Sequence, residues 1–484
     1  MVFVFIFLFL IIYFFHKLLR SQFFNSNKNE SFLQQIPGPF NFPIIGGVYL
    51  LDRNNLHLSF DKLYKKYGKI FSIKFGVVNT VVLNEPDIIF EAFHKNANFF
   101  SDRYMLPSIN ILSGNGSNIA FSNGEYWKKI RSEFSSLITK SKNKNLETEF
   151  NKHYFNFENF LSGYIKKNDT IYIKPFIMTY TFNVVYGLIF NESVEYEQEL
   201  IPKEISDFIQ SLFDVLKETT LCPDYLPFLI YFKNYDHLKE MTKKMIANVN
   251  PKIKKILNEM DESNPKTLLE NLIVSIKNDK DNILKIEHLD HIVVDLILAG
   301  METTGGVIEW MVLNLTNNID IQNKLYKELL SNNFLSYPSI NEASNYPYFN
   351  ACVKETMRRS PIASMGPPRL CTKDIEIGGY IIPKGTQIFS NLYSYSFSEK
   401  FHKDPFLFKP ERFIECPNTP ILIFNLGSRQ CPAKGMAESE IFAFGTKLFK
   451  KFLFTSPNDQ VIDDKPLFHV SLTPKKWLVK ITER

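Results

Sequence analysis

The sequence predicts a mostly α-helical protein with small antiparallel β regions. Up to about residue 365, apolar residues recur at spacings of three and four, for example in residues 61–70 and 124–134, which is the period of amphipathic helices. After Arg369 the pattern changes, and residues 374–392 alternate around Gly-Gly and Pro-Lys-Gly turns, as short antiparallel strands do. We expect a second strand pair near residues 468–481.

The composition is that of a globular protein with a large core. Of the 484 residues, 45% are hydrophobic and 22% are charged, so long disordered stretches are not expected. The net charge of +5 is spread along the chain without a block of like charges, which argues against nucleic-acid binding. The five cysteines are widely and irregularly spaced, which favours a reducing compartment over a disulfide framework. Glycine-rich nucleotide-binding motifs are absent, so no flavin, nicotinamide or ATP site is evident.

The N-terminus predicts a retained, single-pass transmembrane anchor over residues 1–20. Residues 1–15 are uncharged and almost wholly apolar, and with the next few residues a helix reaches ~28 Å, just enough to span a bilayer. The alternative is a cleaved signal peptide, but no basic residue precedes the apolar run and no small-residue cleavage site follows it. Lys17, Arg20 and Lys28 follow the run, which places the bulk of the chain on the cytoplasmic side.

A linker is expected between the anchor and the globular body. Residues 21–47 begin with a polar stretch, NSNKNES, and end with PGPFNFPIIGG, where prolines stiffen the chain and glycines end the segment. Residues 48–484 then form the predicted catalytic domain.

The stretch FNLGSRQCPAKG, residues 424–435, carries the clearest chemical signal. A cysteine that binds a metal must be a thiolate, which backbone N–H groups at a turn and at a helix start stabilise. Gly427 offers the turn before Cys431, and a helix-like run follows. Phe424 would shield one side of the sulfur, and Arg429 is placed to pair with a carboxylate of a porphyrin. Taken alone, the stretch also permits a buried structural cysteine.

These residues resemble the haem-binding loop of the cytochrome P450 family, Phe-x-x-Gly-x-Arg-x-Cys-x-Gly. Phe424, Gly427, Arg429 and Cys431 match it. The resemblance implies a haem-thiolate fold in which Cys431 ligates the iron of haem b (iron protoporphyrin IX). It also implies a membrane-bound protein of the microsomal type, in the endoplasmic reticulum with its catalytic domain in the cytoplasm.

A second motif of the same family is an E-x-x-R pair on a predicted helix. Glu355 and Arg358 are three residues apart, so both side chains lie on one helix face. Further along, Arg412 in the stretch Pro-Glu-Arg-Phe matches the residue that completes the family's buried Glu-Arg-Arg network. The role implied is structural, because such charges are buried only when each is paired.

Residues 295–310 resemble the family's central helix over the haem. Ala299 and Gly300 are small and let the helix approach the porphyrin, while Thr303 can hydrogen-bond the carbonyl four residues back. Glu302 would supply an acid beside it, so that carboxyl and hydroxyl relay protons to oxygen bound at the haem. The alternative is a packing threonine with a solvated glutamate.

Two further arginines and one tryptophan match the family's propionate ligands. Trp127 and Arg131 form the W-x-x-x-R pair, whose side chains reach a haem propionate from one helix face. Arg369, after Gly-Pro-Pro, fits the ligand of the second propionate.

The sequence departs from the family pattern at two places. Ala433 replaces the last glycine of the haem loop, which is expected to leave the turn tighter without abolishing haem binding. Gly305 and Gly306 lie inside the central helix, where each costs roughly 1 kcal/mol relative to alanine. We expect a kink or a wider pocket there.

The expected function is a monooxygenase in which Cys431 holds the iron and donates electron density to favour O–O cleavage. The substrate would be a lipophilic small molecule. Because the chain has no flavin or nicotinamide motif, electrons would come from a separate NADPH-cytochrome reductase. Four lysines are candidates for its docking face: Lys128, Lys129, Lys434 and Lys447.

Two other functions stay open. A haem-thiolate isomerase or dehydratase would use the same cysteine without O2 or a reductase. A non-catalytic haem- or lipid-binding protein would need no proton relay at all.

Overall fold

The computed structural model of the chain describes residues 31–33, 35–143, 146–167, 169–197, 203, 206, 224–226, 229, 235–332, 337–468 and 471–484. The predicted anchor and the first part of the predicted linker lie outside the described residues. Within these ranges, one helix, Ile286–Asn317, is long and apolar enough to cross a membrane, but most of it is buried inside the protein. It is therefore a core helix, and the anchor stays a prediction.

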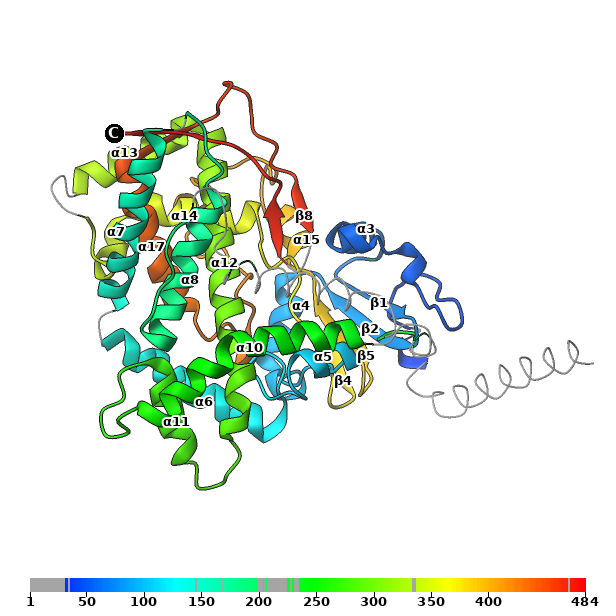
Figure 1. Cartoon of the computed structure of the whole chain (residues 1–484). Coiled ribbons are helices and arrows are strands. Elements are labelled where there is room, and N and C mark those ends of the chain that lie inside the picture. Colours follow the sequence, from blue (N-terminus) through cyan, green and yellow to red (C-terminus); the bar gives the residue numbers. More distant parts are fainter. Residues whose placement is uncertain are drawn as a thin grey trace, which may run out of the picture.

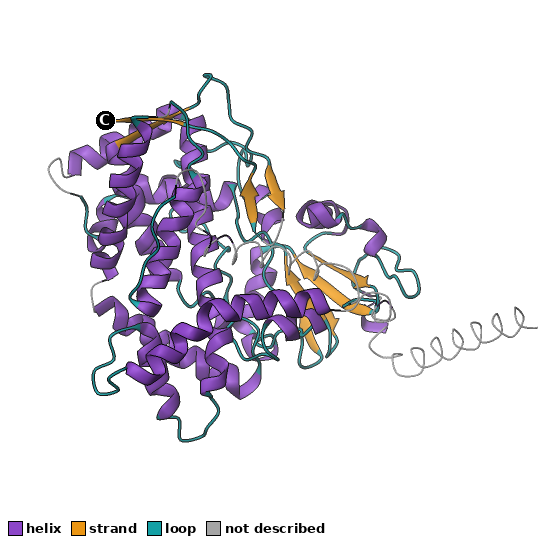
Figure 2. Cartoon of the chain, in the orientation of Figure 1, coloured by secondary structure: helices purple, strands orange, loops and turns teal. Residues whose placement is uncertain are grey.

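Helices make up most of the fold and gather on one side of it, while the largest sheet lies on the other (Figures 1 and 2). The helices are α3 (Leu56–Tyr67), α4 (Pro86–Phe90), α5 (Pro107–Leu112), α6 (Gly124–Asn143), α7 (Leu146–Ile165), α8 (Lys174–Phe190), α10 (Asp236–Glu259), α11 (Leu268–Lys277), α12 (Leu289–Asn317), α13 (Ile319–Asn332), α14 (Pro347–Arg359), α15 (Leu392–Phe397), α16 (Arg412–Glu415) and α17 (Lys434–Lys451). The mostly α-helical prediction is confirmed.

Within the described residues, the strands form one four-stranded sheet and three antiparallel pairs. The strands are β1 (Ile70–Phe75), β2 (Val78–Leu83), β3 (Arg369–Leu370), β4 (Ile375–Ile377), β5 (Tyr380–Ile382), β6 (Gln387–Ser390), β7 (Phe452–Thr455), β8 (Pro466–Phe468), β9 (Leu472–Pro474) and β10 (Lys480–Glu483). The sheet has the order β1-β2-β6-β3, and only β2 and β6 run parallel. The strands predicted at residues 374–392 are confirmed as the pair β4–β5 and as β6. The pair predicted near residues 468–481 is confirmed in part, because β8 pairs with β9 whereas β10 pairs with β7, which the sequence did not predict.

One hairpin lies where the sequence predicts helices. Strands β1 and β2 pair antiparallel around a turn at Gly76, whose φ is +56°. Strand β2 is buried at five of its six positions, so the alternation that marks a half-exposed strand is missing there. In β1 the alternation is present but covers only the five residues from Phe71 to Phe75. The sequence does contain a signal for these strands, because β-branched residues are frequent in residues 70–83.

Helix α12 forms the centre of the helical part and packs against α8 (Figure 1). It runs without a break past Gly305 and Gly306. A Cβ at Gly305 would lie 3.0 Å from Met178 Sδ of α8, and a Cβ at Gly306 would lie 2.1 Å from Ile362 Cδ1. The two glycines therefore let neighbouring segments pack close to α12, which is a different role from the kink that the sequence suggests.

Glu355, Arg358 and Arg412 form a buried charge network, here called the closed network. The Glu355 carboxylate accepts from Arg358 Nε and Nη2 at 2.8 Å each and from Arg412 Nε at 3.2 Å. The remaining Arg358 donors bind the carbonyls of Ser396 and Pro405, both at 2.8 Å. The predicted Glu-Arg-Arg network is confirmed, and it ties α14 to the chain that leads into the Cys431 loop.

Candidate functional site

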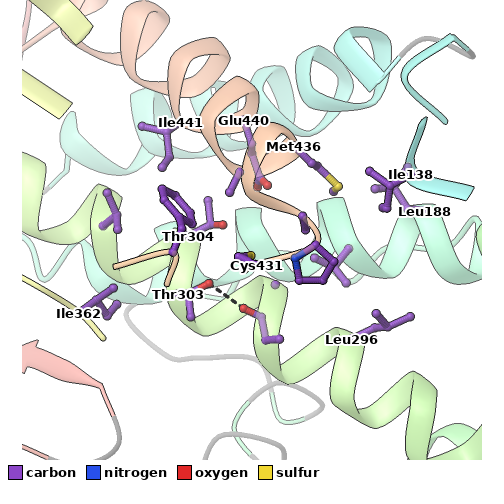
Figure 3. A pocket seen from close by; sticks show the side chains of 18 of the residues that line it. Ile138, Leu188, Leu296, Thr303, Thr304, Ile362, Cys431, Met436, Glu440 and Ile441 are labelled. Atoms are coloured by element: carbon purple, nitrogen blue, oxygen red, sulfur yellow. Dashed lines mark hydrogen bonds between the residues drawn. The ribbon is translucent and has the colours of Figure 1, made fainter. Parts of the chain in front are cut away.

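A cavity of about 210 Å³ lies between α12, α17, α8 and the Cys431 loop (Figure 3). Its wall is almost entirely apolar, and Cys431 and Thr303 both line it. Other lining residues include Phe134, Val185, Leu188, Leu296, Ile362, Phe424, Met436 and Ile441. The cavity brings the predicted thiolate and the predicted threonine to one apolar chamber.

The loop before Cys431 is held by a glycine that no other residue can replace without movement. Gly427 has φ +71°, and a Cβ there would lie 1.6 Å from the backbone oxygen of Phe93. A 3-10 turn over Gly427–Arg429 follows, and the Cys431 N–H donates to the Phe424 carbonyl at 2.8 Å. The predicted turn is therefore present and fixes the sulfur at the cavity wall.

The surroundings of the Cys431 sulfur have opposing effects on the pKa of its thiol. Burial raises the pKa of the Cys431 thiol, whereas the Ala433 N–H and the Arg131 charge lower it. Without a metal the group is a thiol, and a coordinated cation displaces the proton. Ala433 has φ −99° at the start of α17, a conformation open to any residue, so its methyl group causes no backbone strain.

Four arginines surround the same loop, and we call them the arginine cluster: Arg103, Arg131, Arg369 and Arg429. Arg429 Nε donates to the Ser101 carbonyl and Nη2 donates to the Ser122 carbonyl, both at 2.5 Å. Its third nitrogen, Nη1, is buried and has no partner among the described residues. The guanidinium lies over the ring of Trp127, 3.8 Å from the centroid, which places the predicted tryptophan beside the predicted arginine.

Arg369 is fully buried in strand β3. Its Nη2 donates to Asn425 Oδ1 at 2.8 Å and to the Leu426 carbonyl at 2.9 Å, so it holds the Cys431 loop directly. Its Nε has no partner within the part of the chain that the structure describes. The guanidinium also lies 3.6 Å from the centroid of the Phe93 ring.

The other two members hold the rim of the site. Arg131 Nη2 donates to the Gln430 carbonyl at 2.6 Å, next to Cys431. Arg103 donates to the carbonyls of Ala120 and Pro367 at 2.9 and 3.1 Å. Sequence reasoning missed Arg103, because a single arginine in a loop has no local pattern that shows its burial.

The arginine cluster has two acids nearby, Asp295 and Asp102, but their charges offset only part of the lowering of the pKa that burial causes at Arg103 and Arg429. None of its members forms an ion pair with a described carboxylate, and burial lowers the pKa of Arg429, which Arg103 and Arg369 lower further. Guanidinium groups remain charged in proteins, so the cluster needs external negative charge. The two propionates of a porphyrin suit it, because guanidinium forks bind carboxylates and two buried N–H groups are free among the described contacts. The residues present therefore fit a haem.

Helix α12 supplies the wall opposite the sulfur. Ala299, Gly300 and Thr303 line the cavity as expected, and Thr303 Oγ1 donates to the Ala299 carbonyl at 2.7 Å (Figure 3). A Cβ at Gly300 would lie 2.6 Å from Val185 Cγ2. The small size of Gly300 thus also serves the packing of α8 on α12.

Glu302 does not join Thr303 at the cavity. Its carboxylate is 5% exposed and accepts a hydrogen bond from Ser471 Oγ at 3.0 Å. Burial raises its pKa, whereas the nearby Lys174 lowers it. The side chains of adjacent residues on a helix point about 100° apart. Thr303 therefore faces the cavity, whereas Glu302 points toward Ser471. The structure does not assemble the predicted carboxyl–hydroxyl pair.

A different glutamate lines the cavity. Glu440 of α17 is 2% exposed, and its side chain points into the chamber (Figure 3). The sequence analysis did not single it out, because an isolated acid in an amphipathic helix normally faces solvent. Its neighbours in the helix, Ile441 and Phe442, are buried as well, but this burial is a property of the structure and gives no signal in the sequence.

The four candidate docking lysines do not form one exposed face. Lys447 is 2% exposed and donates to the Ala443 carbonyl at 2.8 Å, and burial lowers its pKa to about 8. Lys447 is therefore removed from the docking set. Lys129 pairs with Asp279 at 3.2 Å, whereas Lys128 and Lys434 keep well-exposed side chains.

Three comparisons with known proteins agree on one family. The family model Cytochrome P450 matches residues 36–481. The probable cytochrome P450 515A1 of Dictyostelium discoideum is 36% identical over 92% of this chain and 91% of its own length. The probable cytochrome P450 522A1 of the same organism is 30% identical over 95% of each chain.

The solved structures give the same fold. A zebra fish cytochrome P450 determined with progesterone has a TM-score of 0.78 and covers 88% of this chain and 99% of its own. The sequence identity is 23%, so this likeness concerns the fold.

Proposed function

This chain belongs to the cytochrome P450 family, and on that premise we propose that it is a monooxygenase that inserts one atom of O2 into a lipophilic small molecule. Members of the family are generally haem-thiolate monooxygenases. In the proposal, electrons come from a separate NADPH-dependent reductase, because the sequence shows no flavin or nicotinamide motif.

One observation carries the proposal. A half-buried cysteine faces Thr303 across an apolar cavity, beside an arginine cluster that forms no ion pair with a described carboxylate. Cys431 would hold the iron of haem b, and the arginine cluster with Trp127 would hold its propionates. The haem, when bound, supplies the activation of O2, since a thiolate ligand favours O–O cleavage.

The chain's own residues prepare the chamber. With haem bound next to the sulfur, the apolar wall on the α12 side would exclude water and bind a lipophilic molecule without selecting among lipid classes. The Thr303 hydroxyl donates its hydrogen bond to the Ala299 carbonyl. Its oxygen lone pairs can therefore accept a hydrogen bond from a group inside the cavity. Progesterone was bound to the zebra fish relative, which supports a lipophilic substrate as a class.

A haem-thiolate isomerase or dehydratase is the second candidate. The orientation of Glu302 favours it, because the acid expected beside Thr303 is held by Ser471 instead. Such an enzyme needs neither O2 nor reductase. Turnover under argon, with no reductase present, would identify it.

The membrane location belongs to the same proposal. It is supported by the apolar residues 1–15 and by the basic residues that follow them. The full chain should stay in the membrane pellet after alkaline extraction, and a chain that starts at residue 21 should be released more readily. Complete release of the full chain would contradict the anchor.

The first experiment is an absorption spectrum of the purified, dithionite-reduced protein with and without carbon monoxide. We expect a far-red-shifted Soret band that the variant Cys431→Ala loses. The protein is then combined with NADPH and a reductase, where oxygen consumption should depend on both. A band typical of histidine ligation, or a protein without haem, would refute the proposed function.

A further inference from the structure

Asp295 of α12 holds the turn that leads into α6. Its Oδ2 accepts a hydrogen bond from the Ile119 N–H at 3.0 Å and another from the Ala120 N–H at 2.9 Å. Residues 119–123, here called the entry segment, connect this turn to α6. Ile119 and Ser122 are buried, so the polar groups of the entry segment need partners within the protein.

An aspartate costs free energy at this position of a central helix. Burial raises the pKa of Asp295 to about 6, and the two N–H groups together with the Arg103 charge offset part of this effect. An apolar side chain would avoid the desolvation of a charge. It would also leave the N–H groups of Ile119 and Ala120 without their acceptor. The carboxylate therefore serves the entry segment rather than the helix that carries it.

Arg103 holds the entry segment from the other side. Its Nε donates to the Ala120 carbonyl at 2.9 Å. Its backbone N–H donates to Asn123 Oδ1 at 2.7 Å, and its carbonyl accepts from Asn123 Nδ2 at 3.0 Å. Both backbone groups of Ala120 are thus bound by side chains, the N–H by Asp295 and the carbonyl by Arg103.

The entry segment in turn holds Arg429. Arg429 Nη2 donates to the Ser122 carbonyl at 2.5 Å and to Asn123 Oδ1 at 3.3 Å. Nη1 of the same guanidinium is buried and has no partner among the described residues. Because a guanidinium is a rigid, planar fork, the atoms that bind Nη2 also decide the direction in which Nη1 points.

We propose that Asp295 is a positioning residue for the haem carboxylates, which fixes the Arg429 guanidinium through the entry segment so that Nη1 meets a propionate. The inference rests on the proposed function, because it takes haem as the ligand of the arginine cluster. Loss of the carboxylate frees the entry segment, and the propionate then loses a donor with a fixed direction. Cys431 remains able to hold the iron.

The test measures the rate of haem transfer from the full-length holoprotein to apomyoglobin. We expect Asp295→Ala to transfer haem at least tenfold faster than the wild-type protein. Asp295→Asn keeps an oxygen that accepts the two N–H groups, so it should transfer haem less than threefold faster. The control Asp290→Ala removes another aspartate of α12, which accepts from Asn250 at 2.9 and 3.0 Å, and should change the rate less than twofold.

A double-mutant cycle tests whether Asp295 acts through Arg429. In the Arg429→Met protein, Asp295→Ala should accelerate haem transfer by less than a further twofold, because the arginine that it positions is already gone. Fold-changes of the two substitutions that multiply would overturn the positioning role and leave the monooxygenase intact. If Asp295→Ala does not yield a folded holoprotein, Asp295→Asn is compared in the same two backgrounds.

A second readout reports on the propionates directly. The propionate bending bands in the resonance Raman spectrum should shift in Asp295→Asn and stay at their wild-type positions in Asp290→Ala. Wild-type bands in Asp295→Asn would overturn the role of Asp295. Absence of the far-red-shifted carbon monoxide band in the wild-type protein would overturn the proposed function, and the inference with it.

Discussion

The closed network and the arginine cluster are both buried and rich in arginine, yet their charges are balanced in opposite ways. In the closed network one carboxylate accepts from two arginines, and the spare donors of Arg358 bind backbone carbonyls. In the arginine cluster burial lowers the pKa of Arg429 and the neighbouring arginines lower it further, and two nitrogens of the cluster have no described partner.

The difference shows which charges stabilise the fold and which await a ligand. A buried charge is tolerated when it is paired and hydrogen-bonded. The closed network meets that condition from within the chain, so it belongs to the scaffold. The arginine cluster meets it only with an added anion, so it belongs to the binding site.

The largest effect is expected from Glu355→Ala. Removal of the carboxylate leaves Arg358 and Arg412 buried without a counter-charge, which costs about 3–5 kcal/mol. We expect little folded protein and almost no bound haem, measured as haem per polypeptide after purification. The control Glu415→Ala changes an exposed acid of α16 and should behave as wild type. A Glu355→Ala protein with full haem content would show that the closed network is dispensable.

A smaller effect, limited to the ligand, is expected from Arg429→Met. The variant keeps the bulk of the side chain but removes a donor aimed at the propionate site. We expect haem to transfer to apomyoglobin at least tenfold faster, which corresponds to about 1.4 kcal/mol. Arg53→Met, an exposed arginine, is the matched control. Equal haem loss in the two variants would exclude Arg429 from the haem site.

Removal of the haem should make the stability depend on anions. The apoprotein keeps the arginine cluster, so phosphate should bind there and stabilise the fold by about 1.4 kcal/mol at ten times its dissociation constant. The holoprotein should respond less, and so should the Arg429→Met apoprotein. Thermal unfolding at fixed ionic strength, with phosphate exchanged for chloride, measures the difference. The same gain in all three proteins would indicate a general salt effect.

The smallest effect concerns pH and lies beside the closed network. Burial lowers the pKa of His402 to about 4, and the charges of Arg358 and Arg412 contribute. The unfolded chain therefore takes up the proton first, and the stabilisation present above pH 6.5 is lost as the pH falls toward 4. Between pH 7.5 and 5.5, the free energy of unfolding of His402→Phe should fall by about 1 kcal/mol less than that of the wild-type protein. An unchanged slope of the unfolding free energy in urea against pH would contradict it.

The parts of the site that sequence reasoning predicted are those encoded locally. Gly427 and Cys431 are four residues apart in one loop, and Glu355 and Arg358 are three residues apart on one helix. Within each motif the short spacing along the chain already constrains the geometry. Hairpin β1–β2 was missed because β2 is buried on both of its faces and the alternation in β1 is short. A strand that is buried on both faces loses the alternation by which it is identified.

The rest depends on tertiary packing. Sequence reasoning placed Glu302 at the cavity on the strength of its position beside Thr303, but the rotation of α12 sends it to Ser471. Arg103 and Glu440 lie in the site because distant segments close over them. No local pattern carries that information, since each is a single charged residue in otherwise ordinary surroundings.

The contact of Gly427 with the Phe93 backbone also bears on how the protein assembles. The Cys431 loop rests on a segment formed early in the chain, and the Arg429–Ser101 hydrogen bond there joins residues 328 positions apart. Contacts of such sequence separation form late, because the loop-closure entropy must be overcome first. During synthesis Cys431 leaves the ribosome long after the segment around residue 93. In the proposed function, capture of haem would therefore be a final step of folding, and a defect near residue 93 should yield a nearly complete protein that cannot bind it.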